Sequence, residues 1–352
     1  MCNQNGSLNP PPPIATKLFP PIGLLAAKLN SDFDCGIRQR FFRGMDFSGP
    51  VGDPGWFGPG SAVWYVHSHT PALIFGLQCA AFLEGLDPSI YWMGSTHSRL
   101  AERDRQGMPT GRIDAEGSRV RLAHSLAFFI GTAYGSTPTA ERLARTVRSM
   151  HHTVKGVRPD GLAYDADDPD WLRWNYATVV WGIATAHELY HGRPLADIDQ
   201  YYREFTRVGV ALGGTQLPTT KAETLECLHS YLPRLGLTHG MALSTGPNLA
   251  RNAEVPAAAK LADWAICDAL PQWAAEMVMY RRPHPTRRVA RRAVQWTVIN
   301  ASQAVMGPLR EFREATARVA SGVAGGPGAH TEPHYIPGTD PIRPRELVEQ
   351  GL

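Results

Sequence analysis

The stretch RSMHHTVKGVRPDGLAYDADDPDWLRW, residues 148–174, joins two segments of helical pattern. Across the start of this stretch, apolar residues from Leu143 to Val154 recur at the three- and four-residue spacing of one helix face. RPDG is a typical turn sequence. Asp168 and Pro169 are typical of a helix start, because the aspartate accepts hydrogen bonds from free amides and proline fits the first turn. The stretch therefore predicts a helix, a turn and a second helix.

The same helical periodicity recurs along most of the chain. It predicts helices over residues 119–134, 138–155, 170–191, 195–212, 258–281 and 286–320. Only AVWYVHSHTPALIFG, residues 62–76, suggests a strand. We expect an all-α fold, a single mainly helical domain over residues 21–320. A disordered N-terminal segment, residues 1–20, and a Gly/Pro-rich tail, residues 321–352, are expected to flank it.

Composition narrows the class of protein. The 352 residues are 43% hydrophobic, which is enough for a large core, and the net charge of +3 predicts no nucleic-acid partner. Five cysteines without a CxxC pair favour free thiols in a reducing compartment. The chain shows no secretory signal and no apolar run of about 20 residues. We expect a cytoplasmic protein without a transmembrane segment, and the sequence leaves open a homodimer.

One segment is strongly basic. YRRPHPTRRVARRAVQW, residues 280–296, combines arginines with apolar residues at helical spacing. The pattern is typical of a solvated face on an amphipathic surface helix. Weak docking to an anionic membrane surface is the alternative.

Two adjacent histidines end the helix predicted over residues 138–155. His151 falls in phase with Met150 and the other apolar residues, whereas His152 points about 100° away, toward Arg148 and Lys155. We therefore predict that His151 faces inward and His152 faces outward. An inward imidazole is either a hydrogen-bonded core residue or a ligand, and the spacing alone leaves both open.

The preceding helix carries a second polar group on one face. Arg121, His124, Ser125 and Phe128 follow at i, i+3, i+4 and i+7. The short link GSTPT makes the two helices antiparallel neighbours, so His124 and His151 can face one pocket inside the bundle. Such a pocket suits haem, because an imidazole nitrogen binds iron and a guanidinium pairs with a propionate. The alternative is a buried Arg–His–Ser polar network.

Several motifs occur in an order that belongs to a known family. They are GPGSAVWYV (58–66), MGSTHSR (93–99), RLAHS (121–125), HHTVKGVRPDGLAYDADDPDWLRW (151–174) and GRPLADIDQYYREFTRVGVALGG (192–214). Over about residues 55 to 310 the chain resembles the oxygenases related to the fungal mycophenolic-acid side-chain cleavage enzyme and the bacterial latex-clearing proteins. That resemblance implies an all-α fold and b-type haem held by one histidine.

Carried over by this resemblance, the iron ligand is His151, and the catalytic residues are Arg121, His124 and Ser125. In the latex-clearing proteins the position of His124 is a lysine that can cover the distal iron site. The implied reaction is oxidation of a small hydrophobic or aromatic molecule by O2 or a peroxide. Residues expected to contact the haem are His151, Arg121, His97, Met150 and Phe128. Tyr176 and Asp87 depart from the family pattern, because many members have histidine at these positions.

A competing pattern lies in TAHELYHG. His187, Glu188 and His191 match the H-E-x-x-H pattern of zinc hydrolases, in which two imidazoles bind zinc and the glutamate activates a water. Gly192 to Pro194 end the helix at once, so we expect a surface position for both histidines. Zinc hydrolysis and haem binding without chemistry are the two alternatives to a haem oxygenase.

Overall fold

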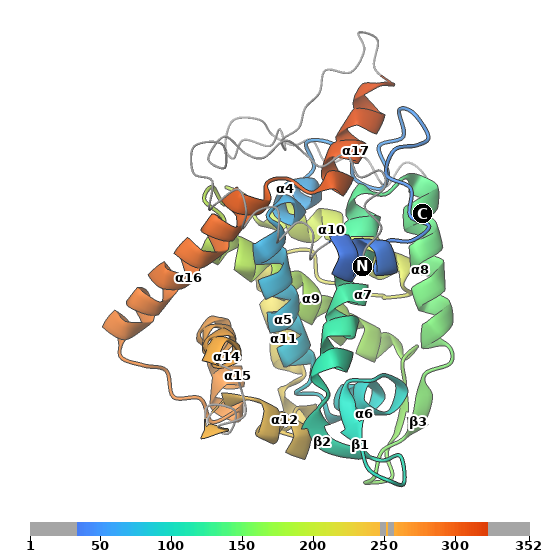
Figure 1. Ribbon diagram of the computed structural model, residues 1–352. Coiled ribbons are helices and arrows are strands. Elements are labelled where there is room, and N and C mark those ends of the chain that lie inside the picture. Colours follow the sequence, from blue (N-terminus) through green and yellow to red (C-terminus); the bar gives the residue numbers. More distant parts are fainter. Residues whose placement is uncertain (1–33, 247–250, 253–256, 323–352) are drawn as a thin grey trace.

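The computed structural model describes residues 34–246, 251–252 and 257–322. These residues form a single mainly helical domain with two small sheets of two strands each (Figure 1), so the prediction of an all-α fold is confirmed. The expected disordered segment, residues 1–20, lies outside the described residues, as does nearly all of the expected tail, residues 321–352.

Two buried helices cross at the centre of the domain, α5 (Thr70–Glu84) and α9 (Pro169–Tyr190). Their backbones meet at two glycines. A Cβ added to Gly182 would lie 2.5 Å from the carbonyl oxygen of Gly76, and one added to Gly76 would lie 2.7 Å from the Cα of Ile183. Real Cβ atoms do not approach other atoms so closely, so only glycine permits this crossing.

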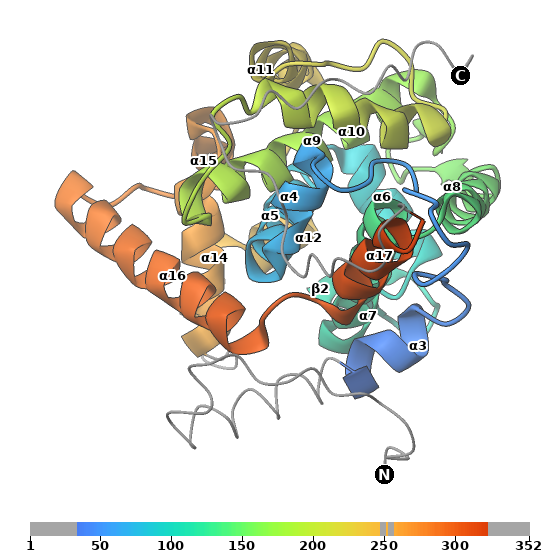
Figure 2. The same ribbon diagram turned by 90° about the horizontal axis from the view of Figure 1, so that it is seen from above.

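The remaining helices surround this pair. They are α3 (Gln39–Phe41), α4 (Ala62–Ser68), α6 (Pro88–His97), α7 (Ala115–Tyr134), α8 (Thr137–His151), α10 (Asp199–Ala211), α11 (Lys221–Ser230), α12 (His239–Ser244), α14 (Ala257–Ala269), α15 (Gln272–Met277), α16 (Pro285–Met306) and α17 (Arg310–Ala320), with a π-helical turn η1 (Asp34–Arg38) and a 3-10 turn η2 (Leu232–Arg234). The antiparallel strand pairs are β1 (Ala101–Arg103) with β2 (Pro109–Ile113) and β3 (Lys155–Val157) with β4 (Ala163–Asp165). Helix α16 lies along one side of the domain (Figure 2).

The strand suggested at residues 62–76 is wrong, because the segment forms α4 and the start of α5. Each helix has its own N-cap: the Ser61 hydroxyl accepts from the amide of Trp64, and the His69 ring accepts from the amide of Ala72. Six of the seven residues of α4 and ten of the 15 residues of α5 are buried. A helix covered on all sides loses the alternation of polar and apolar residues that marks its period.

The predicted helix start at Asp168 is confirmed, since its carboxylate accepts from the amide of Asp170 at 2.9 Å. Two long predicted helices are each broken in two. Pro271 separates α14 from α15, and Gly307 ends α16 with a φ of 66°, which favours glycine. The helix predicted over 138–155 stops at His151, because residues 155–157 pair with β4 instead.

The buried Arg318 fastens α17 to the rest of the domain. Its guanidinium donates to the backbone carbonyls of Asp53 at 2.7 Å, Phe47 at 2.8 Å and Tyr134 at 3.0 Å. The charge is buried, but it is distributed over several carbonyl acceptors, which offsets part of the cost of its desolvation. This residue therefore holds the last described helix against the end of α7.

None of the described helices is by itself long and apolar enough to cross a bilayer. Helices α5 and α6 meet that test of length and composition only as a pair, and they are bent by 111° relative to each other. Helix α5 is a central core helix of this domain.

The glycine crossing gives a test of the fold. Helix propensity alone predicts that Gly182→Ala stabilises α9 by up to about 1 kcal/mol. Overpacking against the Gly76 carbonyl predicts a loss of about 1–3 kcal/mol instead. Chemical denaturation should show the loss for Gly182→Ala and little change for Gly192→Ala, whose nearest atom to a new Cβ is 3.9 Å away. A more stable Gly182→Ala protein would contradict the crossing.

Candidate functional site

Helices α7 and α8 pack against each other, as the short GSTPT link predicts. Their closest approach is at Gly131, where an added Cβ would lie 2.4 Å from Cδ1 of Leu143. Pro138 stands in the first turn of α8. The antiparallel pair brings the end of α8, which carries His151, alongside the first half of α7, which carries Arg121.

His151 is half-buried at the last position of α8. Its Nδ1 is buried and has no hydrogen-bond partner, and its ring meets Trp171 edge to face at 6.2 Å. Burial lowers the pKa of His151, the Asp167 carboxylate opposes this, and the charge of Arg121 lowers the pKa further. The imidazole is therefore neutral at pH 7, which is the form that binds a metal ion.

The outward phase of His152 is confirmed, because its side chain is exposed and pairs with Asp167. The inward position of Met150 is wrong, since it is 55% exposed. The covered face of α8 runs through Ala140 and Ala144, so the i+7 step from Ala144 leads to His151 and leaves Met150 outside. Met150 is thus on the solvent side of the last turn.

The polar face of α7 is only partly covered. Arg121 and His124 are exposed, and Ser125 and Phe128 are half-buried, so the alternative of a fully buried polar network is wrong. The His124 ring meets Phe41 of α3 edge to face at 4.6 Å. Burial lowers the pKa of His124, and the charges of Arg40 and Arg121 add to that effect.

The charge of Arg121 acts on both imidazoles, which have different aromatic neighbours. His124 lies against Phe41, and His151 lies against Trp171. Both pKa values are lowered, so the two rings are neutral bases beside a permanent cation. This combination can hold an anionic group and accept a proton at neighbouring positions.

Glu84, at the end of α5, is not among the residues that the sequence predicts for the site. Burial raises the pKa of Glu84 to about 7, while the charge of Arg121 and the hydroxyl of Thr178 act in the opposite direction. The Thr178 hydroxyl lies 3.5 Å from a carboxylate oxygen of Glu84. The available signal was one acidic residue at the end of an apolar run, residues 70–84. A carboxyl with this pKa exchanges protons near neutral pH.

His97 is exposed at the end of α6, and its Nε2 lies 3.1 Å from the hydroxyl of Tyr164. Tyr164 belongs to β4, where its ring covers Gly156 of the paired strand β3. His97 therefore links α6 to the hairpin that follows His151. The contact of His97 with Tyr164 therefore helps to position that hairpin.

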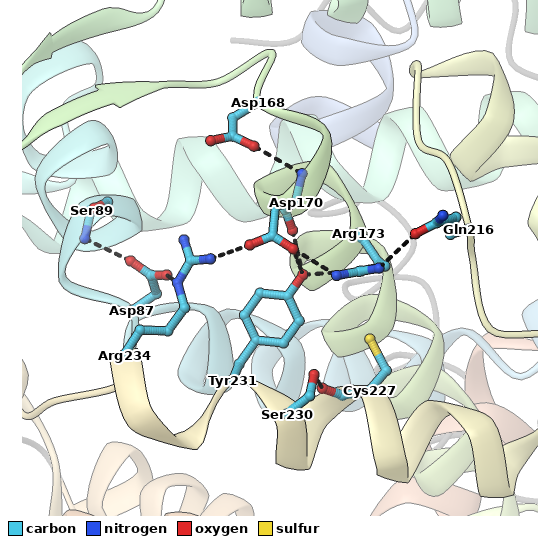
Figure 3. Close-up of polar contacts among 10 residues, drawn as sticks. All are labelled: Asp87, Ser89, Asp168, Asp170, Arg173, Gln216, Cys227, Ser230, Tyr231 and Arg234. Atoms are coloured by element: carbon cyan, nitrogen blue, oxygen red, sulfur yellow. Dashed lines mark hydrogen bonds and ion pairs between the residues drawn. The ribbon is translucent and has the colours of Figure 1, made fainter.

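An ionic network holds the start of α9 and α6 (Figure 3). Asp87, 2% exposed, accepts from the amide of Ser89 at 2.8 Å and lies 3.5 Å from the Arg234 guanidinium. Arg234 also pairs with Asp170, which accepts from the hydroxyl of Tyr231 at 2.8 Å. Asp87 departs from the family's histidine, and here it serves as a helix cap and ion-pair partner.

Tyr176 departs from the family pattern in a similar way. It is buried on α9, and its hydroxyl donates to the carbonyls of Tyr202 at 3.3 Å and Pro218 at 3.4 Å. Its ring stacks on Phe205. Both departures therefore have a structural role that requires no histidine.

The expected surface position of the HELYH histidines is wrong. His187 is only 1% exposed, and His191 is half-buried. The chain folds back after Pro194, and the amide of Leu195 donates to Nε2 of His187 at 3.0 Å. Nδ1 of His191 accepts from the amide of Arg193 at 3.0 Å. Both imidazoles thus cap the end of α9.

The glutamate of the same motif has a partner as well. Both carboxylate oxygens of Glu188 lie 2.8 Å from Nζ of Lys221. Across residues 34–246, 251–252 and 257–322, no three His, Cys, Asp or Glu side chains are grouped so that they could hold a metal ion. The contacts of HELYH are those of a helix terminus, and they do not support zinc hydrolysis.

His187 and His191 belong to a larger cluster of histidines. The other members are His67, which lies in α4, and His69, which is the C-cap residue of α4. Burial lowers the pKa of His67 to about 3 and that of His191 to about 4. It also lowers the pKa of His69 and His187, and the neighbouring imidazoles add to the effect at His187. The cluster is therefore uncharged at neutral pH.

A cleft of about 340 Å³ opens between α6, β2 and the start of α12. Tyr91 and Trp92 form an aromatic wall, and Arg158 and His239 supply polar groups. None of the residues predicted to form the functional site lines this cleft. It is therefore separate from the group around Arg121.

A comparison with protein families matches residues 64–299 to the model described as "ER-bound oxygenase mpaB/B'/Rubber oxygenase, catalytic domain". The matched residues include Arg121, His124, Ser125 and His151. No curated protein and no solved structure matches the chain.

The histidine cluster predicts acid sensitivity. An unfolded histidine titrates near pH 6.5, and the folded cluster titrates well below it. Stability is therefore complete above about pH 6.5 and falls as the pH drops toward about 4, by about 1.4 kcal/mol per pH unit for each such group. His187→Gln keeps an acceptor for Leu195 and should flatten this slope in denaturation curves. The exposed control, His152→Gln, should not, and equal slopes in both variants would contradict the argument.

Proposed function

The chain belongs to the mpaB/B'/rubber oxygenase catalytic-domain family, and from this membership we propose that it is a haem b-dependent oxygenase. An oxygenase is an oxidoreductase, so this class of activity follows from the family. We further propose a small hydrophobic or aromatic substrate and O2 or a peroxide as co-substrate. The observation that supports haem most directly is the half-buried, neutral His151, whose Nδ1 has no hydrogen-bond partner.

The residues around His151 suit a haem group. Iron needs a neutral imidazole, and the haem propionates need a cation. Nδ1 of His151 is one of several buried side-chain atoms without a partner, and a bound group near this half-buried ring would supply one. The charge of Arg121 acts on the same imidazole, so a cation is available beside it. His151 would hold the iron, and Arg121 would pair with an anionic group.

When bound, haem supplies the iron that binds and activates O2 or a peroxide. The residues of the chain would then handle charge and protons. Arg121 holds negative charge beside the iron ligand. His124, a neutral base beside Arg121, can accept a proton, and Ser125 offers a hydroxyl on the same face of α7. Glu84, with a pKa of about 7, can take up or release a proton at neutral pH.

Glu84 also favours an enzyme over a haem carrier or sensor. A carrier needs the iron ligand and a closed pocket, and it gains nothing from a carboxyl that titrates near neutral pH. Keeping a half-buried carboxyl at the end of a core helix costs stability unless it has a role. Perturbed carboxyls of this kind are concentrated at catalytic sites.

The two adjacent histidines provide the first test of this function. His151→Ala should abolish haem binding, because it removes the iron ligand, and His152→Ala should retain it, because that side chain faces solvent. Pyridine-haemochrome content and the visible spectrum of each purified variant measure the difference, with circular dichroism as the control for folding. Haem retained by His151→Ala and lost by His152→Ala would contradict the assignment.

Glu84 provides the second test. If its ionised form accepts a proton during turnover, peroxide-dependent oxidation of 2-methoxyphenol should rise with pH through an inflection near pH 7. Glu84→Gln should remove the inflection and lower the rate by about 100-fold, while the haem content stays unchanged. An unchanged inflection in Glu84→Gln would exclude this carboxyl as the group responsible.

A further inference from the structure

Helix α16 is the least covered long helix of the domain. It has 22 residues, and Ile299 is its only buried side chain. It lies at the periphery in both views (Figures 1 and 2). Four large apolar residues on it are exposed: Val289 at 67%, Val294 at 66%, Val298 at 58% and Trp296 at 45%. A helix that buries so little gains little stability from tertiary packing.

The polarity of α16 is inverted. Its polar side chains face the domain and donate hydrogen bonds to backbone carbonyls. These bonds run from Arg288 to Asp268 at 2.9 Å, from Asn300 to Tyr190 at 2.8 Å and from Gln303 to Ser68 at 3.3 Å. Arg291 also points inward, where it lies 4.9 Å above the ring of Trp264. The helix is therefore attached through its polar face.

The outward face carries no charge. At about 100° per residue, a sector about 160° wide runs from Trp296 to Val294; it presents small or apolar side chains, threonine and Asn300, which donates to the Tyr190 carbonyl, and Val298 lies about 40° beyond Val294. Arg292 borders one edge of this sector and Arg287 borders the other. An uncharged face with an arginine at each edge is compatible with a helix that lies in a membrane interface, with arginines reaching the headgroups.

The charge around this helix identifies the occupant of that face. Between Glu276 and Glu311 the sequence has no acidic residue, and it has seven arginines: Arg281, Arg282, Arg287, Arg288, Arg291, Arg292 and Arg310. Asp268 lies 3.8 Å from Arg291 and Glu314 pairs with Arg310, but a second copy would still bring together two surfaces that carry Arg281, Arg287 and Arg292. An anionic lipid surface complements the same charge.

We propose that α16 docks the domain on an anionic phospholipid surface, with its uncharged face at the level of the headgroups and Arg281, Arg287 and Arg292 toward the lipid phosphates. The helix would lie flat on the surface, since it is too polar to span it. This placement would hold the domain beside a reservoir of hydrophobic molecules. The docking does not depend on haem binding or on turnover.

Vesicle flotation of the full chain tests the proposal. Vesicles of phosphatidylcholine mixed with phosphatidylglycerol should bind at least about tenfold more protein than vesicles of phosphatidylcholine alone, and added salt should reduce the difference. Val294→Asp should lower binding to the mixed vesicles about tenfold. The matched control is Val157→Asp on β3, since Val157 is also 66% exposed and lies far from α16 in sequence, and it should bind like the original chain. Arg287→Gln should weaken only the part of the vesicle binding that depends on phosphatidylglycerol.

Two results would overturn the proposal. One is equal binding to vesicles with and without phosphatidylglycerol, or no binding to either. The other is a dimer in sedimentation experiments that Val294→Asp converts to a monomer while vesicle binding stays unchanged, because the outward face would then belong to a second copy. Circular dichroism of each variant verifies that the helical content is retained, and none of the substituted residues belongs to the proposed catalytic group.

Discussion

The backbone contact between α5 and α9 is the constraint on which the remaining structure depends. Gly76 and Gly182 let the two helices approach until a carbonyl oxygen of one lies where a Cβ of the other would be. That crossing positions both ends of the pair. The last residue of α5 is Glu84, and the first turn of α9 carries Trp171, the aromatic neighbour of His151. Two hydrogen atoms in place of side chains therefore set the positions of Glu84 and Trp171, whereas Arg121 and His151 come from α7 and α8.

The histidines of this protein differ in their exposure and in the hydrogen bonds that their ring nitrogens accept. His187 and His191 accept hydrogen bonds from backbone amides, so they complete the end of α9 although their spacing matches a metal motif. His151 has a buried Nδ1 without a partner, as His187 and His67 also have, but His151 is only half-buried and the charge of Arg121 acts on it. The contacts of His187 and His191 are those of a helix terminus, and the half-buried His151 is the histidine for which we propose a bound ligand.

Arg121 connects the candidate catalytic group, because its charge lowers the pKa of both His124 and His151 and opposes the rise at Glu84. The group lies on partly open helix faces, whereas the core of α7 packs through Leu126 and Ile130 on the opposite side. Helix α16 shows another consequence of uneven coverage, since its polar side meets the domain and its apolar side does not. For these two regions we propose partners that are not polypeptide, haem in the first case and a lipid surface in the second.

The sequence by itself determined the helical class, the family, the start of α9 at Asp168 and the opposite phases of His151 and His152. Caps, turns and helical phase are local, since they depend on residues within a few positions along the chain. Only the tertiary structure decided that residues 62–76 are helical, that Met150 is exposed, that His187 is buried and that Glu84 has a raised pKa. Those properties depend on which distant helix covers a given face. The largely buried α5 shows no polar–apolar alternation, and the burial of His187 depends on a chain that folds back beyond Pro194.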